Sequence, residues 1–484
     1  MFGDFKGSST IEAQVTPSNS SRPAFSRSLF PSDFIFGAGS AAYQIEGAAY
    51  IDGKGPSIWD TYSKNHPDRI LDGSNGDVAA DFYHRYKDDI KLMKKVGLDS
   101  FRFSISWPRV LPTGKVKGGV GINHKGVEFY NNLINELLSN GIVPFVTIFH
   151  WDVPQTLEDE YGGFLSPKIV KDFQEYAAFL FETFGDRVKH WCTLNEPFIF
   201  SLIGYNFGQT APGRCSAYVG NCLGGDSATE PYIVGHNLLL AHAAAVKVYK
   251  QKFQVSQKGK IGITLVAEWY KSKLNTQSSR DAASRALEFS LGWFLHPITY
   301  GYYPRIMQSV LGNRLPNFTK YESYSLKGSF DFLGMNYYTG KYANALPAVS
   351  VNQSYYTDVQ THTGTFFMYP EGLQNLLIYI KNKYNNPPVY ITENGVGDPS
   401  TLPFNVIIND TIRIKYIHDH ISSILKSIKL GANVKAYYVW AFLDDFEWSS
   451  GYTSRFGLVY VDFKNNLGRH LKYSAYWYKH FLLK

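Results

Sequence analysis

Short apolar runs alternate with longer amphipathic segments along most of the chain. Runs rich in β-branched and aromatic residues predict eight buried strands, at residues 34–38, 100–105, 143–149, 188–194, 260–266, 330–336, 389–392 and 434–440. Between them, helical spacing of apolar residues predicts helices at residues 81–96, 128–140, 168–184, 236–253, 282–293 and 410–430. Strand alternating with helix is typical of a parallel sheet, and eight such units predict an α/β protein with a closed (β/α)8 TIM barrel. A doubly wound open sheet is the structural alternative.

The series of strands and helices is not interrupted by a long Gly/Ser-rich or Pro-rich linker. We therefore expect residues 27–484 to form one (β/α)8 domain, preceded by a flexible polar arm at residues 1–26. The longest irregular stretches, residues 211–227 and 341–365, follow strands. We expect them to be long βα loops at the C-terminal face of the barrel, where they can shape substrate entry.

Composition limits the function classes. The 484 residues are 44% hydrophobic and 18% charged, which is enough apolar material for a large core and too little charge for disorder. The formal net charge of +7 comes from Lys and Arg residues interleaved with acids, so we expect solvated helix faces and no nucleic-acid partner. No apolar run is long enough to cross a bilayer, so we expect no membrane partner. Aromatic residues make up 16% of the chain, and we expect some of them to line a binding cleft.

The cysteines and glycosylation sequons bear on the compartment. Cys215 and Cys222 bracket a short loop across which a disulfide could close, whereas Cys192 lies in a strand-like run and is expected to be a buried thiol. Asn-x-Ser/Thr sequons begin at Asn19, Asn317, Asn352 and Asn409. Together with the cysteine pair, they favour the secretory pathway (a vacuole, apoplast or plastid-like store). Residues 1–28 lack the apolar centre of a signal peptide, so the sequence does not decide the compartment. It also leaves open whether the protein forms a homo-oligomer.

Two short strings carry candidate chemistry. Glu196 lies in Thr-Leu-Asn-Glu-Pro at residues 193–197, and Glu393 lies in Ile-Thr-Glu-Asn-Gly at residues 391–395. Taken alone, each glutamate would more often be an ordinary acid at a turn. Each follows a predicted buried strand, however, and parallel barrel strands end at one face. A pair of carboxyl groups brought together at this face is the equipment of a retaining glycosidase.

Further strings make the likeness specific. They read FIFG at 34–37, YQIEG at 43–47, FRFSISW at 101–107, FHWDVPQ at 149–155, NYYT at 336–339, WAFLDDFEW at 440–448 and RFG at 455–457. With the two glutamate strings, they make the chain resemble the family 1 glycoside hydrolases, plant β-glucosidase type, from about residue 30 to residue 481.

This resemblance implies a retaining β-glucosidase that hydrolyses β-D-glucosides of plant secondary metabolites with small aglycones, through a two-step covalent glucosyl-enzyme mechanism. It implies that Glu196 is the acid/base and Glu393 the nucleophile, with Arg102 and Tyr338 supporting the nucleophile. It also assigns substrate binding to Gln44, His150, Asn195, Asn336, Tyr338, Trp440, Glu447, Trp448 and Phe456. No cofactor and no metal site are implied, and the expected partner is a small β-glucoside.

Two departures from the family pattern and two alternatives accompany this interpretation. Thr365 stands where plant relatives usually carry a tryptophan shortly before Tyr369, and Asp445 stands where Asn is usual, which adds an acid near Glu447. A transglucosidase would use the same covalent intermediate and pass glucose to an alcohol. A catalytically silent sugar-binding barrel would keep the fold and lose the chemistry.

Overall fold

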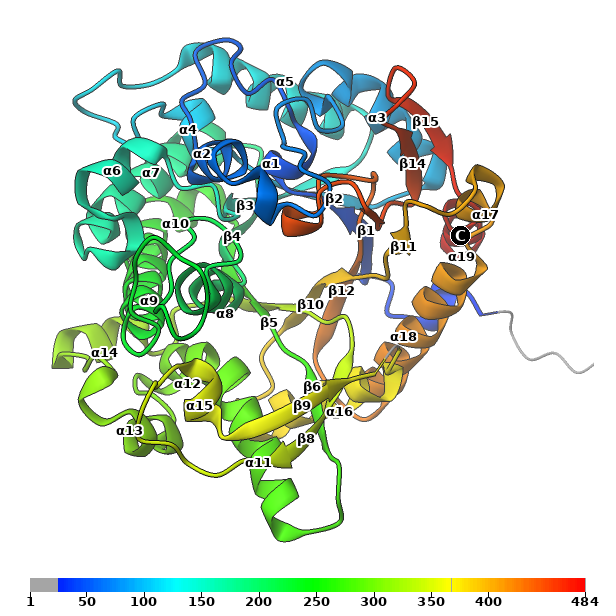
Figure 1. Cartoon of the computed structure of the whole chain (residues 1–484). Helices are drawn as coiled ribbons and strands as arrows, with labels where there is room; N and C mark the ends of the chain where they lie inside the picture. The colour runs from blue at the N-terminus through cyan, green and yellow to red at the C-terminus, as the bar shows by residue number, and fades with distance from the viewer. Residues whose placement is uncertain (1–24, 367, 484) are drawn as a thin grey trace, which may run out of the picture.

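Eight parallel strands close into a barrel in a computed structural model that describes residues 25–366 and 368–483 (Figure 1). In the order in which neighbours pair, the strands are β1 (Ile35–Gly39), β12 (Val434–Trp440), β10 (Val389–Asn394), β7 (Phe332–Asn336), β5 (Lys260–Val266), β4 (His190–Asn195), β3 (Val143–Phe149) and β2 (Ser100–Ser104). All eight predicted strands are present. The predicted closed (β/α)8 barrel is therefore confirmed, and the open-sheet alternative is wrong.

Four strands end one or two residues from their predicted bounds, and two of them, β4 and β10, lead to the candidate catalytic groups. β10 extends to Asn394, so Glu393 lies inside the strand, whereas Glu196 follows β4 directly. The pairing register shifts between Cys192 and Asn195 of β4, and between Ile391 and Glu393 of β10. Such irregularities bend a strand and re-aim its side chains. They occur here next to each glutamate.

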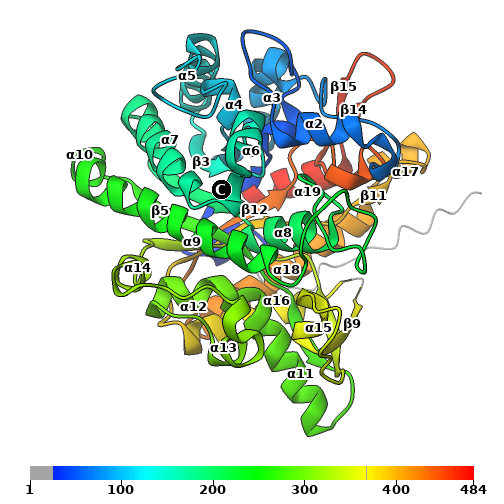
Figure 2. The same cartoon turned by 60° about the vertical axis from the view of Figure 1, so that its left-hand side comes forward.

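Helices cover the outside of the barrel at the predicted places. α7 illustrates the pattern, because its buried residues, such as Ile169, Phe173, Ala177 and Leu180, recur three or four positions apart. The predicted helices correspond to α3 (Phe82–Val96), α5 (His124–Ser139), α7 (Lys168–Phe184), α9 (Glu230–Val248) and α18 (Thr411–Lys429). Figure 2 shows α7 and α9 side by side.

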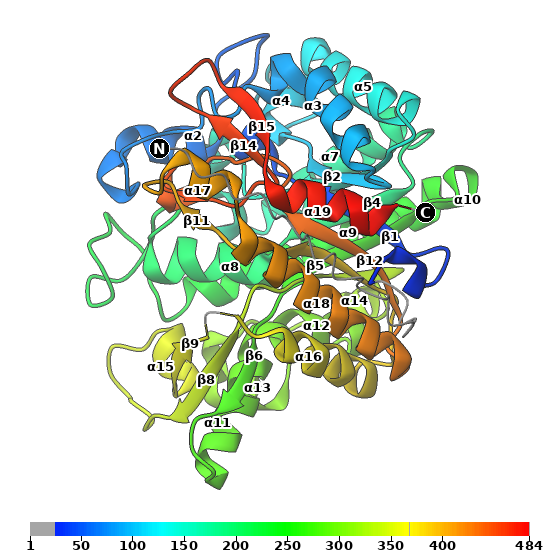
Figure 3. The same cartoon turned by 90° about the vertical axis from the view of Figure 1, so that its right-hand side faces the viewer.

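The remaining helices refine the prediction. The expected helix at residues 282–293 is part of a longer interrupted run, made of α11 (Gln277–Leu287), the π-helical turn η6 (Glu288–Gly292) and α12 (Trp293–Tyr300). Two helices that were not predicted, α16 (Pro370–Lys383) and α19 (Tyr473–Leu482), pack on either side of α18 (Figure 3). Shorter helices are α1 (Ala42–Ile45), α2 (Ile58–Asn65), α4 (Trp107–Val110), α6 (Gln155–Tyr161), α8 (Pro197–Leu202), α10 (Gln254–Gln257), α13 (Arg305–Leu311), α14 (Lys320–Leu326) and α17 (Phe404–Ile408).

Aromatic rings fill part of the barrel interior. The ring of Phe145, on β3, lies 5.6 Å from that of Phe332 on β7 and 5.4 Å from that of Tyr438 on β12. Neither β7 nor β12 is a sheet neighbour of β3, so these contacts cross the barrel. Interiors of this fold are more often filled by branched aliphatic side chains. The aromatic surplus of the sequence therefore serves the core as well as the cleft described below.

The two stretches expected to be irregular differ. Residues 341–365 are largely regular: β8 (Gly340–Ala345), α15 (Tyr355–Val359) and β9 (Thr361–Thr365) form a lobe in which β8 pairs with β9 and with β6 (Trp269–Ser272). The expectation of an irregular loop is wrong for this stretch. Residues 211–227 contain no helix or strand, as expected. Two small sheets join β11 (Asp398–Pro399) to β13 (Ser454–Arg455) and β14 (Val459–Asp462) to β15 (Gly468–Leu471).

The predicted N-terminal arm, residues 1–26, lies outside the described residues except for residues 25 and 26. That residues 27–484 form one domain stays a proposal, supported by the single closed barrel. Within residues 25–366 and 368–483, no helix is long and apolar enough to cross a membrane.

Candidate active site

Five polar side chains converge where the barrel strands end. They come from β2, from β4 and the residue after it, from β7 and from β10, and they are Arg102, Asn195, Glu196, Asn336 and Glu393. Parallel strands end at one face of a barrel, which is why residues far apart in sequence meet there. All five are at most 6% exposed, so their charges and hydrogen bonds are little screened by water.

Glu393 is held by one donor on each carboxylate oxygen. Arg102 Nη1 donates to Oε1 over 2.6 Å, and the hydroxyl of Tyr338 donates to Oε2 over 2.6 Å. Hydrogen bonds to a charged group are each worth about 1.5–3 kcal/mol. This arrangement favours an ionised carboxylate in a fixed orientation.

Glu196 has the opposite environment. Burial, and then the negative charge of Glu393, raise the pKa of Glu196 well above its ordinary value. Its Oε1 accepts a 2.6 Å hydrogen bond from Asn336 Nδ2, and Asn336 is itself oriented because its Oδ1 accepts from the Thr392 hydroxyl over 2.7 Å. Glu196 is thus a fixed carboxyl group that favours keeping its proton beside an ionised neighbour.

Asn195 links the nucleophile side of the site to His150. Its Oδ1 accepts from Arg102 Nη2 over 2.6 Å and from Asn336 over 3.2 Å, so its Nδ2 must be the group that lies 2.9 Å from His150 Nε2. His150 Nε2 therefore accepts, and the ring proton lies on Nδ1, which is buried and has no partner among the described residues. Burial, with the nearby Arg102 charge, lowers the pKa of His150 well below its ordinary value. His150 is therefore a neutral imidazole at the wall of the site.

Polar side chains and tryptophan rings form the side of the site around Glu447 and His150. Gln44 Nε2 donates to Glu447 Oε2 over 3.3 Å and to the Phe446 carbonyl over 3.0 Å. The His150 ring is stacked near Trp440 and Trp448, with ring centroids 5.9 Å and 5.8 Å away. Indole faces beside carboxylate and amide groups suit a sugar, which presents both an apolar C–H face and hydroxyls.

Three residues around the site have left-handed backbone conformations. The φ angles of Trp151, Glu196 and Trp448 are 74°, 44° and 49°, a region that residues other than glycine rarely adopt. Such conformations persist only where the surrounding structure enforces them, and they cluster at functional sites. Here they turn the chain at the ends of β3 and β4 and in the loop after β12, and all three side chains face one cavity.

That cavity has a volume of about 230 Å³. It is lined by His150, Trp151, Asn195, Glu196, Tyr338, Glu393, Trp440, Glu447, Trp448 and Phe456. A larger cavity of about 720 Å³ adjoins it and shares Trp151, Glu447 and Trp448 with it. A third, of about 350 Å³, shares Ile199, Ile203 and Phe207 with the larger one. The small cavity suits one sugar ring, with ample space beyond it for a second group.

Comparisons with known proteins agree with this geometry. The sequence model of Glycosyl hydrolase family 1 matches residues 26–484. The chain belongs to glycosyl hydrolase family 1.

Plant glucosidases are prominent among its relatives. The chain is 54% identical to Beta-glucosidase 17 of Arabidopsis thaliana, over 94% of this chain and 91% of that protein, and 53% identical to Furcatin hydrolase of Viburnum furcatum, over 93% and 86%. A solved rice Os3BGlu6 β-glucosidase mutant, in a covalent complex with Glc from GA4GE, superposes with a TM-score of 0.93 at 43% identity, covering 95% of this chain and 100% of that one. The protein is therefore a glycosidase of family 1.

Family 1 residues expected to bind substrate divide into two groups in this structure. His150, Asn195, Tyr338, Trp440, Glu447, Trp448 and Phe456 line the cavity together with both glutamates. Gln44 and Asn336 do not line it, and instead hydrogen-bond to side chains that do. Arg102, expected to support the nucleophile, does not line it either and donates to Glu393. The roles of all these residues in this chain stay proposals.

Trp151 lines the family 1 cavity and was not among the predicted contacts. Its Nε1 donates to the Asn195 carbonyl over 2.9 Å, which joins the loop after β3 to the end of β4. The available signal was its place directly after His150 at a strand end.

Within residues 25–366 and 368–483, no group of three or more His, Cys, Asp or Glu side chains could hold a metal ion.

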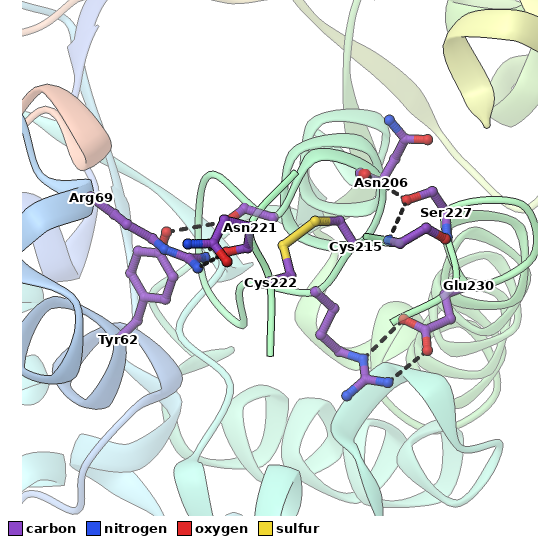
Figure 4. The surroundings of a disulfide bond; sticks show 11 residues. Tyr62, Arg69, Asn206, Cys215, Asn221, Cys222, Ser227 and Glu230 are labelled. Atoms are coloured by element: carbon purple, nitrogen blue, oxygen red, sulfur yellow. Dashed lines mark hydrogen bonds and ion pairs between the residues drawn. A yellow bond between two sulfur atoms is a disulfide. The ribbon is translucent and has the colours of Figure 1, made fainter. Parts of the chain in front are cut away.

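A predicted disulfide borders the larger cavity. Cys215 and Cys222 are bonded, with their Cα atoms 5.5 Å apart (Figure 4), and Cys222 lines that cavity. Cys192 is a buried free thiol, as expected. The loop is fixed further where Arg214 forms a two-point ion pair with Glu230, at 2.9 and 2.6 Å. The wall of the entrance is therefore a covalently closed loop.

Proposed function

We propose that this protein is a retaining β-glucosidase that hydrolyses β-D-glucosides of small plant secondary metabolites. The observation that carries the proposal is the contrast between two carboxyl groups in one buried cavity. Burial and the neighbouring charge favour a protonated Glu196, whereas Arg102 and Tyr338 donate to both oxygens of Glu393. Retaining glycosidases need one carboxyl group of each kind, separated by about 5 Å.

In the first step, a carboxylate oxygen of Glu393 attacks the anomeric carbon of the bound glucoside while the bond from that carbon to the aglycone oxygen breaks. The proton of Glu196 passes to the departing oxygen, so that the aglycone leaves as a neutral alcohol. A glucosyl ester of Glu393 remains. The covalent complex of the rice relative with Glc supports such an intermediate.

In the second step, Glu196 acts as the base and Glu393 is the leaving group. Ester formation removes the negative charge of Glu393, which is one of the causes of the raised pKa of Glu196. Glu196 then favours its ionised form, accepts a proton from water, and the resulting hydroxide attacks the anomeric carbon. Glu393 leaves as carboxylate. Two inversions at the same carbon give β-glucose, so configuration is retained.

Sugar binding follows from the groups that line or support the cavity. We propose that Glu447 and His150 bind glucosyl hydroxyls, that Gln44 holds Glu447 in place, and that Trp440 and Trp448 pack against the C–H face of the ring. The free hydrogen of Asn195 Nδ2 is available for the 2-hydroxyl, a contact expected to strengthen in the transition state.

The aglycone is proposed to lie in the 720 Å³ cavity, because this cavity meets the sugar site at Trp151, Glu447 and Trp448. Its lining combines Ile199, Ile203 and Phe207 with polar groups such as Arg69 and Asn221. Thr365, at the usual place of a tryptophan, ends β9 and is exposed. An aglycone with both apolar and hydroxylated parts fits this lining.

The test is to trap and locate the intermediate. A 2-deoxy-2-fluoro-β-glucoside with a good leaving group should label the protein, and peptide mapping should place the sugar on Glu393. Glu393→Gln should abolish labelling, whereas the exposed-site control Glu128→Gln should leave it intact. The first glucose released from an aryl β-glucoside, followed by NMR, should be the β-anomer. α-Glucose as first product would overturn the proposal, and alkyl glucosides formed in added alcohol would reveal the transglucosidase alternative.

A further inference from the structure

Asp445 is a buried acid that the proposed mechanism does not use. It lies in the loop between Trp440 and Trp448, its exposed fraction is 0%, and neither of its carboxylate oxygens accepts a hydrogen bond from a donor among the described residues. Its neighbour Asp444 is also fully buried but accepts from Arg455 Nη1, Lys472 Nζ and the Gly457 backbone N–H, at 2.8, 2.8 and 2.9 Å. Two cationic side chains therefore balance the charge of Asp444, whereas none donates to Asp445.

The charges around Asp445 are mostly negative. Glu447 is on the same loop, Glu393 faces it from β10, and Asp444 precedes it. The cations nearby are already engaged: Arg455 and Lys472 donate to Asp444, and Arg102 donates to Glu393 and Asn195. Other titratable groups that face this acidic cluster are Glu196 after β4, His150 on the loop after β3, Tyr338 after β7 and Tyr452 after the loop. None of them supplies a positive charge to Asp445.

An ionised carboxylate without a partner is too costly to bury, so such a group keeps its proton. Burial, and then the charges of Glu447 and Asp444, raise the pKa of Asp445 well above its ordinary value. Burial also raises the pKa of Glu447, to about 7, and the two carboxyl groups are close enough to share a hydrogen bond. A protonated carboxyl group carries one O–H donor, and the carboxylate of Glu447 is an acceptor within its reach.

We propose that Asp445 is a positioning residue that acts as a neutral acid: its O–H donates to Glu447 and holds that carboxylate in place for the hydroxyls of the bound glucosyl ring. This inference rests on the proposed function. Gln44 restrains the other side of Glu447, at 3.3 Å from Oε2. Once the proton is lost, two carboxylates face each other without a cation. Glu447 is then displaced, and sugar binding weakens as the pH rises.

The test measures binding in the absence of turnover. Glu196→Gln removes the acid and its own titration, and phenyl 1-thio-β-D-glucoside is a neutral probe that resists hydrolysis. Binding is followed by calorimetry and by tryptophan fluorescence, since Trp440 and Trp448 line the cavity. For E196Q, Kd should be constant at acidic pH and rise about tenfold per pH unit above the point at which the shared proton is lost.

Matched variants separate the proposal from other causes. In E196Q/D445N, Kd should stay flat with pH, because an amide N–H donates to Glu447 at every pH. E196Q/D186N should behave like E196Q, because Asp186 is an exposed acid, with 67% of its side chain accessible. The same pH slope in E196Q and E196Q/D445N, or no slope in E196Q, would overturn the inference alone.

A second readout does not depend on the folding of a variant at position 445. Calorimetry of E196Q in buffers of different ionisation enthalpy should show uptake of about one proton on binding at alkaline pH and none at acidic pH. Zero uptake at both pH values would overturn the inference. Absence of probe binding at every pH would overturn the proposed function and this inference with it, because no sugar would then be positioned.

Discussion

Substitution of Asp444 by Asn tests the buried ion pairs that hold the loop carrying Asp445 and Glu447. The change keeps the size of the side chain and removes its charge, which leaves Lys472 without a counter-charge at 0% exposure. Breaking a buried pair by removing one partner costs about 3–5 kcal/mol. With an unfolding entropy of about 2 cal/mol/K per residue, the 484-residue chain has about 1 kcal/mol/K in total, so Tm should fall by about 3–5 °C.

The pH dependence of this loss has a definite sign. Burial lowers the pKa of Lys472 to about 8, below the ordinary value of about 10.4. Below pH 8, Lys472 is charged in the folded wild-type protein, and Asp444 balances that charge. Above pH 8 the folded protein loses this proton before the unfolded chain does, so the amine is neutral and the substitution removes less. The difference in Tm should therefore be largest near pH 6 and shrink towards pH 9.

Thermal unfolding followed by circular dichroism, at one scan rate and at both pH values, measures the effect. Asp186→Asn, at an exposed acid, is the matched control and should leave Tm within about 1 °C. If Asp444→Asn lowers Tm by less than about 1 °C at pH 6, or lowers it equally at pH 6 and pH 9, the pair with Lys472 is not what stabilises the loop.

Three further predictions concern the site itself. Glu196→Ala should lower kcat/KM by about 10²–10⁴-fold for poor leaving groups and far less for activated ones, which need no proton; a uniform fall across substituted phenyl glucosides would contradict the acid role. Arg102→Lys keeps the charge but cannot donate to Glu393 and Asn195 together, so kcat/KM should fall about 10–100-fold in steady-state assays, and an unchanged value would refute the bridging role. Replacing both disulfide cysteines by Ser should lower Tm and raise KM for bulky aglycones more than for methyl β-glucoside, because Cys222 lines the larger cavity; equal KM changes would separate the loop from aglycone binding.

The barrel could be predicted from the sequence because its strands are covered on both faces and read as nearly continuous apolar runs. Prediction was wrong for residues 341–365, where β8 and β9 are short, half-exposed strands whose pattern is weak. The contact between Phe145 and Tyr438 was equally hidden, since it crosses the barrel and depends on which strands face each other. Closure in three dimensions decides such features, and periodicity along the chain does not report it.

The candidate site shows the same division. The two glutamates and seven of the cavity-lining residues could be named because they stand in recognisable strings at or after the ends of strands. Arg102 and Tyr338 could also be named as supports of Glu393, from the family resemblance. The contacts made by Trp151 and Thr392 could not, because they depend on side-chain directions. Trp151 donates to the Asn195 carbonyl only because its backbone is left-handed, and Thr392 orients Asn336 only because β7 and β10 are neighbours.

The left-handed conformations of Trp151, Glu196 and Trp448 have a consequence for protein engineering. Each costs about 1–2 kcal/mol relative to ordinary backbone, and glycine would relieve that cost. A search for thermostable variants guided by backbone energy alone would therefore select these positions, and it would delete an indole wall or the proposed proton donor. At these three positions, the substitution that would relieve the backbone is the one that would damage the proposed site.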